Sequence, residues 1–136
     1  MSKISVLMSV YKKENPEYLR ASLESILVQT RTADEILLIE DGPLTQELYQ
    51  VVAEYQKKCD YLHVHAMEQN VQLGRALAKG VELCQYDLIA RMDTDDIAMP
   101  DRLEKEEAYM EAHPEVDVVG GAIREFNDEG TIDRVK

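Results

Sequence analysis

The feature that most constrains the fold is an unbroken apolar run, ILLI, inside the segment 35–40. A strand with one face in water alternates apolar and polar residues, whereas a strand covered on both faces is apolar throughout. The run therefore predicts a central strand of a parallel sheet with helices on both faces. Comparable short segments predict further strands at 3–10, 61–66, 86–92 and 116–119.

Helical spacing of apolar residues separates these strands. Asn15 and Pro16 mark the start of the first helix, because asparagine is a good N-cap and proline suits the first helical position. The apolar positions of the four expected helices are Leu19, Leu23, Ile26 and Leu27, then Leu44, Leu48, Val51, Val52 and Tyr55, then Leu73, Leu77, Val81 and Cys84, and finally Leu103 and Met110.

The order of these elements predicts an α/β, Rossmann-like fold with a mostly parallel sheet and right-handed crossovers. The length of 136 residues fits a single domain, 1–136. The segment 122–136 is polar and stays unassigned, apart from a short strand expected near Phe126.

Charge and composition exclude several classes of function. The net charge of -12 argues against nucleic acid as a partner, because phosphate contacts need clustered Lys and Arg. No apolar run approaches the roughly 18 residues of a membrane span, so no membrane segment is expected in this chain. Cys59 and Cys84 are too few for a disulfide framework, which favours a reduced, cytoplasmic setting.

Unusual polar residues follow four of the expected strands. In open α/β sheets ligands bind beyond the carboxyl ends of the strands, and parallel strands bring those ends to one edge. The residues that the strand ends bring to this edge are Ser9, Tyr11 and Glu14, then Glu40, Asp41 and Gly42, then Glu68, Gln69 and Asn70, and last Asp93, Thr94, Asp95 and Asp96. Their convergence predicts a binding site.

The cluster RMDTDD is the sharpest single motif. Three carboxylates within four residues repel one another, and a hard cation such as Mg²⁺ or Mn²⁺ relieves that repulsion. An acidic turn that caps the helix after Pro100 explains the cluster equally well. His63 and His65 share one strand face, where exposed edge-strand side chains are a better interpretation than a metal site.

Four motifs in this order resemble the family 2 glycosyltransferases: ISVLMSVYKKE, EILLIEDG, EQNVQLGRALAKG and LIARMDTDD followed by IAMPDRLEKE. The resemblance extends from Ile4 to about Gly121. It implies a GT-A fold, a nucleotide-diphospho sugar as donor, in particular a UDP-sugar, and a divalent cation, Mg²⁺ or Mn²⁺.

The resemblance also implies roles for individual residues. Tyr11 is expected near the base, Asp41 at the base edge, and Asp93 and Asp95 as a DxD pair, with Asp95 on the metal and Asp93 on the ribose or metal. Arg75 fits either a contact to the diphosphate or an exposed helix position. The full predicted nucleotide-binding set is Ser9, Tyr11, Glu14, Asp41, Asn70, Gly74, Arg75, Asp93 and Thr94, and the metal ligands are Asp95 and Asp93.

The expected function is metal-assisted transfer of a sugar, of the hexosyltransferase type, to a saccharide or lipid-linked acceptor in polysaccharide biosynthesis. Family members carry the acceptor site and the general base after the DxD strand, so we expect both beyond Lys136. The chain is then a truncated, donor-binding half without transfer activity. A cytoplasmic location is expected, at the inner face of the membrane in a longer protein.

Two alternatives remain open from the residues. A sugar-phosphate nucleotidyltransferase has a related architecture but needs a Gly-rich loop where this chain has Tyr11-Lys12-Lys13-Glu14. A non-enzymatic, metal-binding receiver-like module also has acidic strand ends. It uses a late lysine at a strand end, and Gly120-Gly121 stand there instead.

Overall fold

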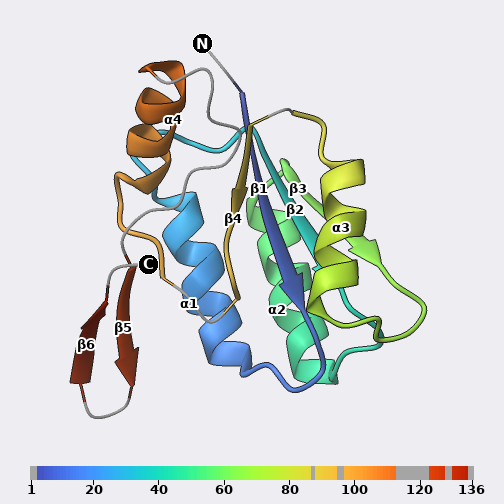
Figure 1. Cartoon of the computed structure of the whole chain (residues 1–136). Coiled ribbons are helices and arrows are strands. Elements are labelled where there is room, and N and C mark those ends of the chain that lie inside the picture. Colours follow the sequence, from blue (N-terminus) through green and yellow to red (C-terminus); the bar gives the residue numbers. More distant parts are fainter. Residues whose placement is uncertain (1–2, 87, 95–96, 113–122, 128–129, 135–136) are drawn as a thin grey trace.

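The computed structural model describes residues 3–86, 88–94, 97–112, 123–127 and 130–134. The elements are β1 (Ile4–Val10), α1 (Pro16–Leu27), β2 (Glu35–Glu40), α2 (Gln46–Lys58), β3 (Leu62–Ala66), α3 (Leu73–Leu83), β4 (Leu88–Arg91), α4 (Arg102–Ala112), β5 (Ile123–Asn127) and β6 (Gly130–Arg134). From β1 to α4, strands and helices alternate as the sequence predicts (Figure 1). The strand expected at 116–119 lies outside the described residues, and β5 contains Phe126.

Four strands form a wholly parallel sheet in the order β3-β2-β1-β4. Val6 of β1 lies between Ile36 of β2 and Ala90 of β4. The chain runs outward from β1 to β2 and β3, then returns to the other side of β1 to form β4. The strand order thus reverses between β1 and β4, which is the place where such sheets bind ligands. Strands β5 and β6 form a separate antiparallel pair.

The sheet is covered on both faces, as the apolar run in β2 predicts. Side chains alternate along β1, so that Val6 and Met8 join the core beneath α1 and α2, whereas Leu7 packs with Ala76 and Leu77 of α3. Figure 1 shows α3 on the opposite side of the sheet from α1 and α2. Each fully buried apolar side chain of this size contributes about 1.5–3 kcal/mol to folding.

Local capping fixes where the helices begin. The Asn15 side chain accepts a hydrogen bond of 2.8 Å from the Glu17 N–H, and Pro16 occupies the first turn of α1, as predicted. Thr45 caps α2 in the same way through the Leu48 N–H. No helix in the described part of the chain combines the length and apolarity needed to cross a bilayer.

A buried carboxylate ties the strands together at the amino end of the sheet. Glu35 is 2% exposed and accepts hydrogen bonds from Ser5 Oγ at 2.7 Å and from the Gln85 N–H at 2.9 Å. Its second oxygen lies 3.0 Å from His63 Nδ1. Burial alone raises the pKa of Glu35, but the hydrogen bonds from Gln85, Ser5 and His63 outweigh burial and lower the pKa overall.

Replacing Glu35 by glutamine removes these charge-assisted bonds and turns one acceptor into a donor. We expect Glu35→Gln to lower the free energy of unfolding by about 1–3 kcal/mol at pH 7. The pKa of Glu35 is depressed below its ordinary value of 4.5, so the stabilisation is present above pH 4.5 and disappears as the pH falls through the folded-state pKa. Urea unfolding at pH 7 and below pH 4.5 measures both effects.

Glu54→Gln is the matched control for this prediction. Glu54 pairs with Arg20 on the surface, where ion pairs contribute little. A smaller loss than that of Glu35→Gln is expected. Equal losses from the two variants, or a pH-independent deficit in Glu35→Gln, contradict the role assigned to the buried carboxylate.

Candidate functional site

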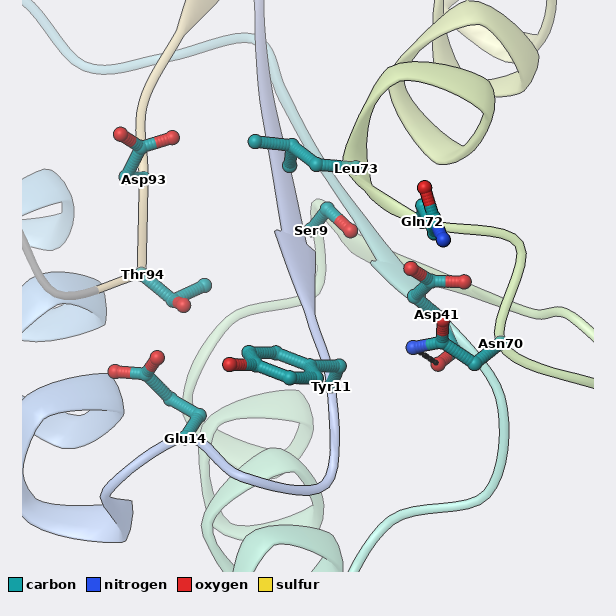
Figure 2. A pocket seen from close by; sticks show the side chains of 9 residues that line it. All are labelled: Ser9, Tyr11, Glu14, Asp41, Asn70, Gln72, Leu73, Asp93 and Thr94. Atoms are coloured by element: carbon teal, nitrogen blue, oxygen red, sulfur yellow. Dashed lines mark hydrogen bonds between the residues drawn. The ribbon is translucent and has the colours of Figure 1, made fainter.

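A cavity of about 400 Å³ opens at the carboxyl edge of the sheet. Its size is typical of pockets that bind small molecules. The residues that line it are Ser9, Tyr11, Glu14, Asp41, Asn70, Gln72, Leu73, Asp93 and Thr94 (Figure 2). They come from the ends of β1, β2 and β4, from the connection between β3 and α3, and from the first residue of α3, so the strand ends converge as expected.

The reversal of strand order creates this cavity. Ser9 lies near the end of β1, and Tyr11 and Glu14 lie in the turn that follows, where the Glu14 N–H donates to the Tyr11 carbonyl at 3.0 Å. Asp93 and Thr94 follow the neighbouring strand β4. Two adjacent strands whose connections leave in different directions produce an open crevice between their ends.

The Asp41 segment is locked to the loop after β3. Asp41 is 4% exposed, and its Oδ1 accepts a hydrogen bond of 2.7 Å from the Val71 N–H. Asn70 Nδ2 donates to the Asp41 carbonyl at 3.2 Å. Gly42 has φ +88°, and a Cβ at this position would lie 2.6 Å from the Asn70 nitrogen, so only glycine permits the close approach.

Gln72 and Leu73 line the cavity although neither belongs to the predicted binding set, and Leu73 was expected only as an apolar position of the third helix. Gln72 has φ 73° and ψ 160°, a region that is populated almost entirely by glycine, and its side chain does not cap α3. Leu73 opens α3 and is 49% exposed. Both lie between two predicted residues, Asn70 and Gly74, and that adjacency was the available signal.

The structure brings together most of the predicted nucleotide-binding set. Seven of the nine residues line the cavity: Ser9, Tyr11, Glu14, Asp41, Asn70, Asp93 and Thr94. Gly74 and Arg75 do not line it. Both are exposed in the first turn of α3, and a Cβ on Gly74 would meet no atom within 4 Å. The predicted metal ligand Asp95 lies outside the described residues.

Most of the residues that line the cavity have acidic or polar side chains. Its described lining includes the carboxylates of Glu14, Asp41 and Asp93 and no Lys, Arg or His side chain. In Figure 2, Ser9 and Tyr11 lie between two groups of polar side chains. One group consists of Asp93, Thr94 and Glu14, and the other of Asp41, Asn70 and Gln72. The arrangement suits an extended ligand whose two ends differ in chemistry.

A metal ion held by protein side chains alone needs several ligands close together. Among the residues that the structure describes, no group of three or more His, Cys, Asp or Glu side chains is placed to hold one. Mg²⁺ usually takes only one or two carboxylates and completes its shell with phosphate and water. The Asp93 carboxylate and the Thr94 hydroxyl are hard oxygen donors of the kind that such an ion accepts.

Glu40, another polar residue expected at the sheet edge, does not line the cavity. It follows Ile36 and Leu38 in the alternation of β2, and those two side chains lie in the core beneath α1 and α2. Glu40 is 7% exposed, and burial raises its pKa.

The sequence has clear relatives. The family model for glycosyl transferase family 2 matches residues 5–136. The chain is 52% identical over 124 residues to a glycosyltransferase of Haemophilus influenzae, covering 91% of this chain and 46% of the relative. It is 47% identical over 126 residues to the amylovoran biosynthesis glycosyltransferase AmsE of Erwinia amylovora, covering 93% and 47%.

A third relative has a name that states its donor and acceptor. The UDP-Gal:alpha-D-GlcNAc-diphosphoundecaprenol beta-1,3-galactosyltransferase of Escherichia coli is 35% identical over 139 residues, with 98% of this chain and 50% of that protein covered. The chain thus spans about half the length of the curated relatives it matches.

Solved structures share the fold. S. aureus TarS 1-349 in complex with UDP-GlcNAc matches with a TM-score of 0.72 at 23% identity, over 82% of this chain and 32% of that one. The mannosyltransferase PcManGT of Pyrobaculum calidifontis, in complex with GDP-Man and Mn²⁺, matches with a TM-score of 0.71 at 14% identity, over 80% and 32%. The GT-A fold expected from the sequence is confirmed.

The close approach of Gly42 to Asn70 gives a direct test of how the cavity is built. We expect Gly42→Ala to lower the free energy of unfolding by about 1–3 kcal/mol, because the variant combines an unfavourable φ with a backbone clash. Gly74→Ala is the control, since its Cβ enters open space in a helix, and no loss is expected. Thermal or urea unfolding of both variants measures the difference, and equal stabilities contradict the geometry described.

Proposed function

The chain belongs to glycosyl transferase family 2, and we propose that its cavity binds the nucleotide-diphospho sugar from which a sugar is transferred. A single observation carries the proposal: the cavity at the sheet edge has two polar sides separated by Ser9 and Tyr11. A nucleotide-diphospho sugar likewise has a nucleoside end and a charged diphosphate–sugar end. The nucleotidyltransferase and receiver-like alternatives are not favoured by the relatives of the chain.

The side of the cavity that contains Asp41 and Asn70 suits the base. We propose uracil, whose ring N–H donates a hydrogen bond between two accepting carbonyls. A carboxylate beside an amide complements that pattern, and one oxygen of the Asp41 carboxylate is already fixed by Val71. The ring of Tyr11 offers a face for stacking, which contributes about 1–3 kcal/mol per base where it has been measured by alanine substitution in nucleic-acid complexes.

UDP-sugars are also consistent with the names of similar proteins. The Escherichia coli relative uses UDP-Gal, and the TarS structure contains UDP-GlcNAc, whereas PcManGT was solved with GDP-Man. We propose a UDP-sugar as donor and a saccharide or lipid-linked molecule as acceptor. We further propose that the whole protein works at the inner face of the membrane, where it would meet a lipid-linked acceptor.

The acidic side of the cavity suits the diphosphate only together with a cation. Glu14 and Asp93 repel phosphate oxygens, and the described lining offers no cationic side chain to offset the repulsion. We propose that Asp93, with Asp95, holds Mg²⁺ or Mn²⁺. When bound, such an ion acts as a Lewis acid that stabilises negative charge on the departing diphosphate.

The residues of the chain then have separable tasks. Tyr11 and Asp41 bind and orient the base. Asp93 and Thr94 position the diphosphate end, and with it the anomeric carbon of the sugar. Transfer also needs a general base that removes the proton of the acceptor hydroxyl. We assign no carboxylate of this chain to that task and propose that the base and the acceptor site belong to the part of the relatives that this chain does not match.

Calorimetric titration of the 136-residue chain with UDP tests the proposal. We expect binding that depends on Mn²⁺ and that weakens at least tenfold, equivalent to about 1.4 kcal/mol, in Asp93→Ala and Asp95→Ala. Asp41→Asn is expected to weaken UDP and uridine alike, because it alters the base side. Asp60→Asn changes an exposed carboxylate just before β3, at the other end of the sheet, and should leave both affinities unchanged.

Two results contradict the proposal. The first is an absence of UDP binding with or without Mn²⁺. The second is UDP binding that stays as strong in EDTA, and in the Asp93→Ala variant, as it is in the unmodified chain with Mn²⁺.

A further inference from the structure

Three polar side chains are buried along α1 and just beyond its end. Ser22 is 0% exposed, Ser25 is 7% exposed and Gln29 is 6% exposed. Their spacing places them in one row along the helix, close to the apolar positions Leu23 and Ile26. Burying three polar groups is costly unless each is hydrogen-bonded. We call these three residues the α1 polar row.

All three side chains bind main-chain groups of the segment that follows β4. Ser22 Oγ donates to the Asp93 carbonyl at 3.3 Å, and Ser25 Oγ accepts from the Ala98 N–H at 3.0 Å. Gln29 Nε2 donates to the Met99 carbonyl at 2.7 Å. The row therefore fastens the chain before and after the acidic residues 95 and 96 of the sequence.

Gln29 uses every polar group of its side chain. Besides Met99, Nε2 donates to the Ser25 carbonyl at 3.0 Å, and Oε1 accepts from the Leu103 N–H at 3.0 Å. Leu103 lies in the first turn of α4, where N–H groups lack partners inside the helix. One amide thus caps α4 and holds the preceding loop, which a carboxylate or an apolar side chain cannot do.

The next residue reinforces the same attachment. The Thr30 N–H donates to the Pro100 carbonyl at 2.8 Å. Arg31 pairs with Glu107 of α4 at 2.7 Å. The end of α1 and the residues after it therefore anchor the stretch 98–100 and the helix that follows.

We infer that the α1 polar row positions Asp93 and Thr94 for their ligand, because it holds the chain at Asp93 and again at Ala98 and Met99. Ser25 and Gln29 then set the affinity for the metal–diphosphate group without touching it. This inference rests on the proposed function. Asp93 and Thr94 enter the cavity directly after β4, at one end of the fastened segment. A segment held before the ligand arrives loses less conformational freedom on binding than a loose one.

Ser25→Ala and Gln29→Met test the inference, with Ser5→Ala as the matched control. Ser5 is also fully buried and hydrogen-bonded, but it lies at the amino end of the sheet beside Glu35. Affinities for UDP with Mn²⁺, and for uridine without metal, are measured at a temperature at which circular dichroism shows every variant to be folded. Ser25→Ala retains the backbone and packing, which guards against a failure of Gln29→Met to fold.

We expect Ser25→Ala and Gln29→Met to weaken UDP binding with Mn²⁺ about tenfold, while uridine affinity changes less than about twofold. Ser5→Ala should change neither affinity. Hydrogen exchange at Ala98 and Leu103 should accelerate in the two row variants alone. A purely structural role predicts lower thermal stability in all three variants and unchanged affinities, and that result overturns the inference.

The two proposals fail in different ways. If the unmodified chain does not bind UDP in the presence of Mn²⁺, the proposed function is wrong, and the row has no ligand-positioning role. If the unmodified chain binds but Ser25→Ala and Gln29→Met bind equally well, only the positioning inference is wrong.

Discussion

Strands β1 and β2 are buried on both of their faces, and the rest of the molecule follows from that burial. Val6 and Met8 need apolar cover on one side, and Leu7 and Leu37 need it on the other. Helices can supply both covers only if each strand is followed by a crossover, which makes the strands parallel. Parallel strands end at one edge of the sheet. The polar residues that line the cavity can lie there because this edge is outside the apolar core.

A buried carboxylate lies at each end of the sheet, Glu35 at the amino end and Asp41 at the carboxyl end, and their surroundings differ. At the amino end, Glu35 is surrounded by donors from Ser5, Gln85 and His63, so its charge is satisfied within the protein. At the carboxyl end, Asp41 has one oxygen bound by Val71, and the cavity has no cationic side chain in its described lining. The first arrangement satisfies a buried charge within the protein, whereas the second places three carboxylates, those of Glu14, Asp41 and Asp93, around one open cavity.

Much of this organisation was predictable from the sequence, because it depends on local patterns. The apolar run of β2, the Asn15–Pro16 start of α1 and the polar strand ends each reflect short-range chemistry. Gly74 and Arg75 show what the sequence could not predict. Their place in the motif EQNVQLGRALAKG suggested a contact with the ligand, but the direction in which the first turn of α3 faces depends on tertiary packing. The strained backbone of Gln72 likewise depends on how the loop after β3 meets α3.

The role of the α1 polar row could not be predicted from the sequence for a related reason. Ser22, Ser25 and Gln29 bond to groups about 70 residues away along the chain, and local patterns do not reveal such partners. Those partners are main-chain groups: every residue supplies a carbonyl, and every residue except proline supplies an N–H. The attachment of Asp93, Ala98 and Met99 to α1 therefore does not depend on the side chains of these three residues. Side chains at these positions can therefore change over evolution without loss of the attachment, so two proteins with the same fold can differ in sequence here and still hold this stretch of the chain against α1.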